Sequence, residues 1–418
     1  MFSPSTENSE EIVPKSRNIL YRGKAPIASM DGMEELEFFS DTNNPVQIDN
    51  KSLVESAMIM TKLQPGSFSG IKYRHVGKSG LKISNIGLGS AKLFSSENPE
   101  MAEDIIVAAY ENGINFFDIS DPYQQEKAEK EFGNIFRKRK WPRRHFVVCT
   151  KIFWNKYEEG CLSRKEIIES VQTSLNNLQL DYIDLVLINK TDPNCPTEEL
   201  IRAMTYLIDH GKMMYWGTAR WSQGEIYEAI MVAKTMGLIC PITEMSEYHW
   251  FHREKVELYM AELYNKTGFG LMTWSPISYG LCYNPKNSDD SQLIAKLLLK
   301  THLHHGKLGL EVAGETHSNA EAMTKIKQLS AVAENLGCTL NQLAIAWNLR
   351  NQTSQSMVVS AVTIEQFWDI IQSLTFVSKI THHVNEDLDK ILGNKPSRPP
   401  MVSTLQQRWQ TTGGLPPC

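Results

Sequence analysis

The sequence predicts an α/β protein built as a parallel (β/α)8 barrel, a TIM barrel, entered through a short N-terminal β-hairpin. Eight short apolar runs lie between residues 86 and 362, and almost every one is followed by a segment with helical spacing of apolar residues. The runs are apolar at nearly every position, as expected of strands that are buried on both faces. Eight such units over about 300 residues match the size of a (β/α)8 barrel.

The elements are expected in alternation after the hairpin. Two short alternating runs, 72–76 and 81–84, flank a turn with two glycines and predict the hairpin. Ser163, with Glu166 three residues later, predicts a capping box for a helix that runs to Leu178. The strands are predicted at 86–90, 114–118, 146–151, 182–189, 213–218, 242–244, 270–275 and 357–362. The other helices are predicted at 101–111, 126–138, 196–210, 222–236, 253–266, 323–336, 340–350 and 364–374, with 277–320 irregular.

A doubly wound open sheet is the rival fold. That fold usually carries a glycine-rich fingerprint after its first strand. Here the segment reads Gly87-Leu88-Gly89-Ser90-Ala91-Lys92, which lacks the third glycine. The barrel is therefore favoured.

The composition excludes several classes of protein. The 418 residues carry a net charge of −5, without the basic excess of nucleic-acid binders. The longest apolar runs are far shorter than the roughly 20 residues of a membrane span, and the first residues do not resemble a signal peptide. The seven cysteines are scattered without a CxxC pair. We therefore expect reduced thiols in a cytoplasmic protein, with no metal site and no nucleic-acid partner.

Three regions are expected along the chain. Residues 1–70 contain ten acidic and six basic residues and no sustained apolar period, which predicts a disordered acidic tail. Residues 71–396 form the barrel, and residues 397–418 form a flexible C-terminal tail.

Three polar residues follow successive predicted strands. Asp118 ends the second strand, Tyr123 comes five residues later, and Lys151 ends the third. The active site of such a barrel lies at the C-terminal ends of its strands. A carboxylate would keep Lys151 charged and oriented, and the ammonium would lower the pKa of the phenol. Tyr123 would then donate a proton to a carbonyl oxygen as hydride reaches the carbon.

Several longer segments resemble the aldo-keto reductase superfamily. They include KYRHVGKSGLKISNIGLGS, NGINFFDISDPY, LQLDYIDLV, DPNCPTEELIRAM and LGCTLNQLAIAW. YWGTARWS and SEYHWFHREKVE are more narrowly similar to the cytoplasmic β subunits of voltage-gated (Shaker-type) potassium channels. The resemblance implies a (β/α)8 barrel, a homotetramer that docks beneath the cytoplasmic tetramerisation domain of channel α subunits, bound NADP(H) and slow aldehyde reduction. The chain would then meet the membrane only through the channel.

The resemblance also assigns roles to single residues. The catalytic tetrad would be Asp118, Tyr123, Lys151 and Asn189. Asn189 stands where ordinary reductases have His, and an amide cannot exchange protons at neutral pH. Trp274 would stack on the nicotinamide. The other cofactor-binding positions would be Ser90, Asp118, Asn189, Ala219, Arg220, Ser275, Pro276, Ile277, Ser278, Tyr279, Lys286, Gln366 and Asp369.

Some positions depart from the pattern of that family. Met245 replaces a Gln that meets the nicotinamide carboxamide, and a thioether only accepts hydrogen bonds weakly. Tyr279 replaces a small residue near the pyrophosphate, and Val362 lies where the family has a small residue. These changes weigh against tight cofactor binding. Two alternatives therefore stay open: a soluble NADPH-dependent aldehyde or ketone reductase without a channel partner, and a cofactor-free scaffold.

Overall fold

The computed structural model describes residues 70–91, 93–94, 99–120, 125–153, 161–274 and 315–397. Nearly all of the predicted N-terminal tail, and the C-terminal tail from residue 398, lie outside these ranges. The three predicted regions of the chain therefore stay a prediction.

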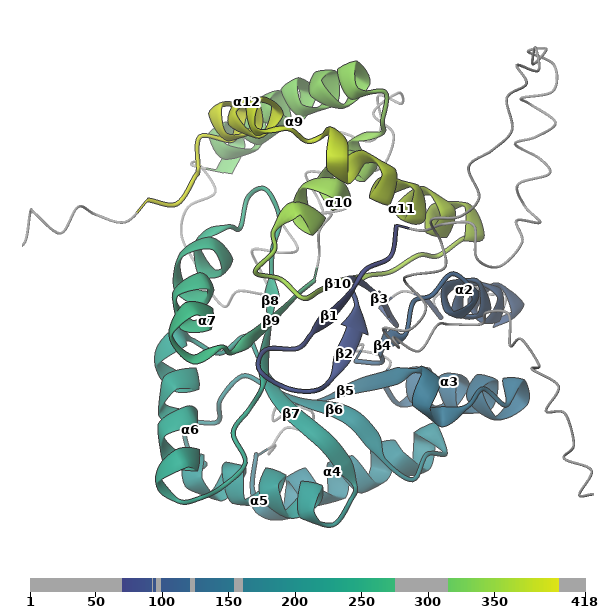
Figure 1. Ribbon diagram of the computed structural model, residues 1–418, viewed down its shortest axis with the longest axis vertical. Helices are drawn as coiled ribbons and strands as arrows, with labels where there is room; N and C mark the ends of the chain where they lie inside the picture. The colour runs from purple at the N-terminus through teal and green to yellow at the C-terminus, as the bar shows by residue number, and fades with distance from the viewer. Residues whose placement is uncertain are drawn as a thin grey trace, which may run out of the picture.

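Eight parallel strands close into a barrel in the order β10-β3-β4-β5-β6-β7-β8-β9 (Figure 1). β10 closes the barrel, because it pairs with β3 on one side and with β9 on the other. The predicted (β/α)8 fold is thus confirmed, and the open sheet is excluded. The strands are β3 (Ile86–Gly89), β4 (Phe116–Asp118), β5 (Val147–Phe153), β6 (Ile183–Asn189), β7 (Met213–Ala219), β8 (Thr243–Glu247), β9 (Gly270–Trp274) and β10 (Ser356–Val359).

Helices surround the barrel as an outer layer (Figure 1). They are α2 (Pro99–Glu111), α3 (Gln125–Arg139), α4 (Arg164–Leu178), α5 (Thr197–Asp209), α6 (Gln223–Thr235), α7 (Ala261–Thr267), α9 (Glu315–Leu336), α10 (Leu340–Arg350), α11 (Ile364–Phe376) and α12 (His382–Leu392). A π-helical turn, η5 (Lys255–Met260), begins the predicted helix 253–266 and leads into α7. Short 3-10 turns, η4 (Arg143–His145) and η7 (Val377–Lys379), were not anticipated.

Local signals in the sequence explain where several helices begin. Ser163 accepts a hydrogen bond from the backbone N–H of Glu166, as predicted for the start of α4, while the Glu166 carboxylate accepts one from Ser170. Full capping boxes form instead at Ser222 of α6 and Thr339 of α10. Each side-chain cap satisfies a backbone donor that the first helical turn leaves without a partner.

The hairpin of β1 (Tyr73–His75) and β2 (Lys82–Ser84) covers one end of the barrel. Its Val76 and Ile83 are fully buried in the same apolar cluster as barrel residues such as Phe116. Gly77 has a positive φ of 55°, and a Cβ there would lie 2.7 Å from the backbone nitrogen of Gly270. Only glycine therefore fits where the turn meets the start of β9.

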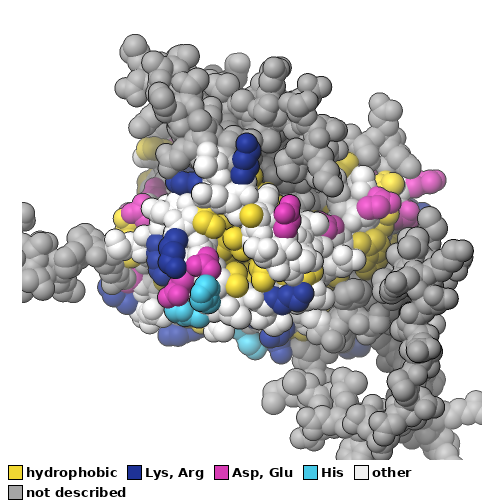
Figure 2. Space-filling view, turned by 90° about the horizontal axis from the view of Figure 1, so that it is seen from above, with side chains coloured by type: hydrophobic (Ala, Val, Ile, Leu, Met, Phe, Trp, Pro, Cys, Tyr) yellow, Lys and Arg dark blue, Asp and Glu magenta, His cyan; other side chains and the backbone are white. Residues whose placement is uncertain are grey.

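The C-terminal part differs from the prediction in two places. Residues 315–320 were expected to be irregular, but they are helical, because α9 begins at Glu315. The helix α12 was not predicted at all. It lies beside α9 at one side of the barrel (Figure 1). Seen from that side, acidic, basic and histidine side chains lie interspersed around a small group of apolar ones (Figure 2).

Candidate functional site

The alternation of side chains along each strand points the predicted catalytic residues into the barrel. Phe116, Cys149 and Leu187 all belong to the apolar cluster inside the barrel. Asp118, Lys151 and Asn189 each lie two residues further along β4, β5 and β6. Because side chains two residues apart on a strand share a face, all three point inward at the C-terminal end.

Asp118 and Lys151 form a buried polar triangle with Ser120. The Lys151 Nζ lies 3.4 Å from Asp118 Oδ2 and donates a hydrogen bond of 2.8 Å to Ser120 Oγ. Ser120 Oγ in turn donates to Asp118 Oδ1 at 2.7 Å. The side chains of Asp118 and Lys151 are only 7% and 12% exposed. Because both charged groups are largely removed from water, the carboxylate holds the ammonium group in place. Ser120 was missed, although it lies two residues after Asp118.

The Asp118 carboxylate also affects the thiol below it. Cys149 is fully buried; its Cα pairs with that of Asp118, and it lies two residues before Lys151 on β5. Burial raises the pKa of Cys149 well above its ordinary value, and the charge of Asp118 raises it further. Cys149 is therefore a neutral packing residue under the ion pair and not a nucleophile.

Asn189 continues this arrangement on the next strand. It ends β6, where its Cα pairs with Phe153 on one side and Ala219 on the other. Its side chain is half-buried. The structure thus brings Asp118 and Lys151 into contact and places Asn189 at the same end of the barrel. Tyr123 lies outside the described residues, so its place in the tetrad stays a prediction.

Two of the predicted cofactor-binding residues touch at the opposite side of the mouth. The guanidinium carbon of Arg220 lies 5.1 Å from the ring centroid of Trp274. Arg220 follows β7 with a positive φ of 65°. Trp274 ends β9 and is half-buried, whereas Arg220 is exposed. A flat aromatic face and a cation are thus presented together.

The remaining described cofactor positions lie around these strands. The buried Ser90 donates its backbone N–H to the Asp118 carbonyl at 2.9 Å. Ala219 and Met245 are buried inside the barrel. Gln366 on α11 is exposed, and its Oε1 accepts a hydrogen bond from the Val362 N–H. Asp369 accepts one from Gln342 on α10. The predicted positions Ser275, Pro276, Ile277, Ser278, Tyr279 and Lys286 lie outside the described residues.

A second charged group at the mouth was missed by sequence reasoning. Glu247 is the last residue of β8, and its Cα pairs with Trp274. Its Oε1 lies 3.3 Å from Nε2 of His249, which is 2% exposed. Burial acts to raise the pKa of Glu247, but the bond from His249 and the charges of His252 and Arg220 outweigh it and lower that pKa. The mouth therefore holds a carboxylate that faces His249, His252 and Arg220.

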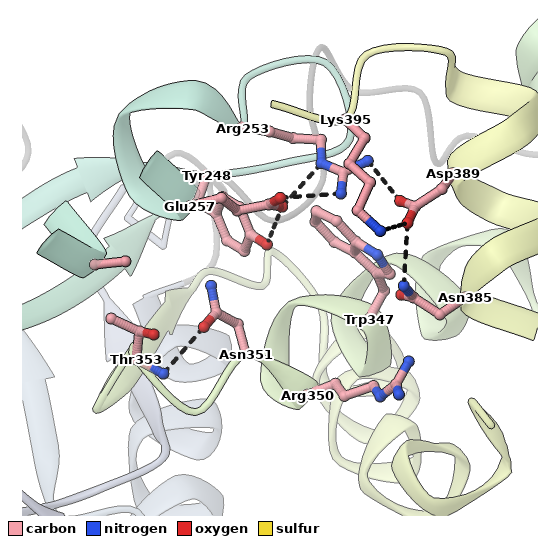
Figure 3. Close-up of a pocket in the computed structure, with 11 residues that line it drawn as sticks. Tyr248, Arg253, Glu257, Trp347, Arg350, Asn351, Thr353, Asn385, Asp389 and Lys395 are labelled. Atoms are coloured by element: carbon pink, nitrogen blue, oxygen red, sulfur yellow. Dashed lines mark hydrogen bonds and ion pairs between the residues drawn. The ribbon is translucent and has the colours of Figure 1, made fainter. Parts of the chain in front are cut away.

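A separate cavity of about 280 Å³ lies outside the barrel, beside α10 and α12 (Figure 3). Its most buried charge is Arg253, which pairs with Glu257 at 2.8 Å and with Asp389 at 2.8 Å. Lys395 pairs with the other oxygen of Asp389 at 2.9 Å. These ion pairs attach α12 to η5, so the cavity is a structural junction rather than a second catalytic centre.

The described part of the chain contains neither a metal-binding cluster nor a membrane-spanning helix. No cluster of His, Cys, Asp or Glu there could hold a metal ion. No helix there is both long and apolar enough to cross a bilayer.

A comparison with known protein families agrees with this geometry. Residues 85–392 match the model of the aldo/keto reductase family, a span that runs from just before β3 to the end of α12. Proteins of this family generally bind NADP(H), and the barrel is an oxidoreductase scaffold of that kind. The matched span covers well over half of the chain and contains the buried ion pair at the barrel mouth; the chain belongs to the aldo/keto reductase family.

Proposed function

We propose that the chain is a cytoplasmic regulatory β subunit of a voltage-gated potassium channel, built on an NADP(H)-binding barrel that reduces aldehydes slowly. The observation that carries the enzymatic half is the buried Asp118–Lys151 pair at the mouth of the barrel. We expect the rate to be slow because Asn189 ends the next strand, and an amide orients a carbonyl by hydrogen bonding but cannot transfer a proton.

The residues of the site divide the chemistry between them. Asp118 and Ser120 hold the ammonium group of Lys151 in place. That positive charge stabilises a phenolate and so makes Tyr123 a better proton donor. Asn189 orients the carbonyl oxygen toward the phenol. NADPH, when bound, supplies the hydride that reduces the carbonyl carbon.

The described part of the cofactor site fits a nicotinamide dinucleotide by its chemistry. The half-buried ring of Trp274 offers a flat face for an aromatic ring, and the exposed Arg220 offers a cation for phosphate. Met245 offers no amide to the carboxamide group, and it is fully buried. We therefore expect binding through stacking and charge, and weaker recognition of the carboxamide.

The channel half of the proposal is supported by two segments that resemble channel β subunits. Residues 215–222 form most of β7 and its C-terminal end, and residues 246–257 run from β8 into η5. They supply Arg220, Glu247 and His249 to the barrel mouth. In this proposal a homotetramer docks against the cytoplasmic tetramerisation domain of the α subunits, at the inner face of the plasma membrane. The alternative is a soluble aldehyde or ketone reductase with the same site and no channel partner.

The first experiment is a titration of the purified chain with NADPH, followed by fluorescence and repeated with NADH. We expect saturable binding that prefers NADPH. Absence of binding would mean that Met245, Tyr279 and Val362 have closed the site. It would favour the alternative in which the protein is a cofactor-free scaffold.

The Tyr123→Phe variant tests the proton donor. Because only the hydroxyl is lost, turnover of an aldehyde should fall by about 100-fold or more while the NADPH dissociation constant stays nearly unchanged. Lys151→Met should have the same effect on turnover. Unchanged turnover in Tyr123→Phe would show that another group donates the proton.

Co-purification separates the channel subunit from the soluble reductase. The chain and a channel tetramerisation domain are mixed at micromolar concentrations and passed over a sizing column. We expect one complex with four copies of each. If the chain elutes alone but still reduces aldehydes, the soluble reductase is the correct function.

A further inference from the structure

Two cysteines lie in neighbouring loops at the C-terminal side of the barrel, next to the strands that carry Lys151 and Asn189. Cys161 lies just before α4, in the connection that follows β5. Cys195 lies just before α5, in the connection that follows β6. The Cys195 thiol donates a hydrogen bond of 3.0 Å to the carbonyl oxygen of Leu162, the residue next to Cys161.

Asp192 holds these two loops together. Its Oδ2 accepts the Leu162 N–H at 3.0 Å, and its backbone carbonyl accepts the Cys195 N–H at 3.1 Å. Asp192 is buried, at 6% exposure. The backbone next to Cys161 is therefore fixed beside the backbone of Cys195. The two thiols are also close enough for the charge of a Cys161 thiolate to raise the pKa of Cys195.

We propose that Cys161 and Cys195 form a reversible disulfide when the protein meets a hydroperoxide, and that this bond ties together the loops following β5 and β6. The proposal does not depend on the channel partner or on cofactor binding. The modification site would lie at the rim of the barrel, next to β5 and β6.

The two thiols suit different steps of the reaction. Cys161 is exposed and meets the oxidant first. Its thiolate attacks the peroxide, so that an S–O bond forms, the O–O bond breaks and water or an alcohol leaves. Cys195 is half-buried, and burial together with Glu199 and Asp192 raises its pKa to about 11. Cys195 is thus a poor first nucleophile. Held beside the sulfenic acid, it loses its proton and attacks the Cys161 sulfur, so that an S–S bond forms and water leaves.

The other described thiols are not arranged in this way. Cys149 is fully buried inside the barrel. Cys240 and Cys338 are half-buried, and each donates to a backbone carbonyl of its own neighbourhood, that of Ile230 and that of Ala333. Cys282 and Cys418 lie outside the described residues, so the test must include them.

Mass spectrometry of the oxidised full-length chain tests the proposal directly. The protein is treated with hydrogen peroxide, its free thiols are alkylated, and it is digested with trypsin without reduction. Trypsin releases Cys161 in the peptide 157–164 and Cys195 in the peptide 191–202. We expect these two peptides to be joined, with a mass two hydrogens lower than their sum, and to be separated again by dithiothreitol.

Thermal unfolding gives a second test. The midpoint of thermal unfolding should rise by several degrees on oxidation, because the cross-link closes a long loop.

Three variants make the result decisive. Cys161→Ser and Cys195→Ser should each abolish the linked peptide and the thermal shift, whereas the control Cys240→Ser should keep both. In Cys195→Ser, Cys161 should accumulate as a sulfenic acid that dimedone traps. Pairing of Cys161 with Cys282, Cys418 or a second chain, or its direct oxidation to sulfinic acid in the unmodified protein, would overturn the proposal.

Discussion

Glu244 is the most completely buried acidic side chain of the described structure, with 0% exposure, on the outer face of β8. Lys255 on η5 pairs with its Oε1 at 2.6 Å, and Thr218 on β7 donates to its Oε2 at 2.6 Å. Burial raises the pKa of Glu244, although Lys255 and Thr218 act to lower it. The carboxylate therefore depends on its partners to remain charged inside the protein.

The Lys255→Met variant should be strongly destabilised at neutral pH, by about 3–5 kcal/mol, because it leaves an unpaired charge in the interior. The control is Lys266→Met, which removes an exposed pair with Glu262 and should cost less than about 0.5 kcal/mol. Denaturant unfolding of both variants measures the difference. Equal losses would show that the buried pair contributes no more than a surface pair.

The pH dependence of this variant has a defined sign. Loss of Lys255 raises the folded-state pKa of Glu244 further above its unfolded value. Between these two values the folded state holds a proton that the unfolded state has lost, so the free energy of unfolding falls as pH rises. The free energy of unfolding of Lys255→Met should therefore be closer to that of the parent protein at about pH 5 than at about pH 7.5. A loss that grows toward low pH would contradict this origin.

At the scale of elements, α3 and α4 pack closely enough to require a glycine. Gly133 is buried on α3, and a Cβ there would lie 2.6 Å from the carbonyl oxygen of Asn177 and 2.7 Å from that of Leu178. Both atoms are backbone at the end of α4, so they cannot move aside as a side chain would. α3 and α4 can approach this closely only because residue 133 has no side chain.

Gly133→Ala should destabilise the fold by about 1–3 kcal/mol, even though alanine favours helices over glycine by about 1 kcal/mol. Gly224→Ala on α6 is the matched control, because the nearest atom to its Cβ would be 4.0 Å away. The control should be neutral or stabilising by up to about 1 kcal/mol. Both values come from thermal or denaturant unfolding. If Gly133→Ala is as stable as the parent protein, α4 must shift to make room for the added methyl group.

The strands were predictable from the sequence because both of their faces are buried. β6, for example, is buried at six consecutive positions, and all of them except Asp184 are apolar. α12 left a weaker signal, since only Leu388 and Leu392 are buried among its polar residues. The first turns of α9, from Glu315 to Ala320, contain a single small apolar residue, so no apolar period marks them.

The same contrast holds for the site. Asp118 and Lys151 were predictable because the ends of consecutive strands meet in a barrel. Ser120 and the Glu247–His249 pair were not, since their contacts depend on how the chain turns after β4 and β8. His249, for instance, reaches Glu247 through a turn that is closed by backbone bonds with His252. Such turns follow from tertiary packing and leave no periodic signal.

At the scale of the whole molecule, the charge of the N-terminal segment bears on the proposed channel role. A peptide that blocks the mouth of a cation pore needs positive charge, whereas residues 1–70 contain ten acidic and six basic residues. We therefore expect that removal of residues 1–70 leaves the inactivation of co-expressed channels unchanged. Current recordings with the full and the shortened chain measure this. Loss of fast inactivation on shortening would show that the segment does plug the pore.

The closing strand β10 has a consequence for how the protein is made. Met357 pairs with Ile86, so the barrel joins two segments that are 271 residues apart in the sequence and leave the ribosome at different times. Until residues 356–359 emerge, the nascent chain holds a sheet with two open edges, which are prone to pair with other chains. Any premature stop codon upstream of Ser356 would leave those edges permanently unpaired. Such a truncated product should aggregate or be degraded rather than persist as a shortened subunit.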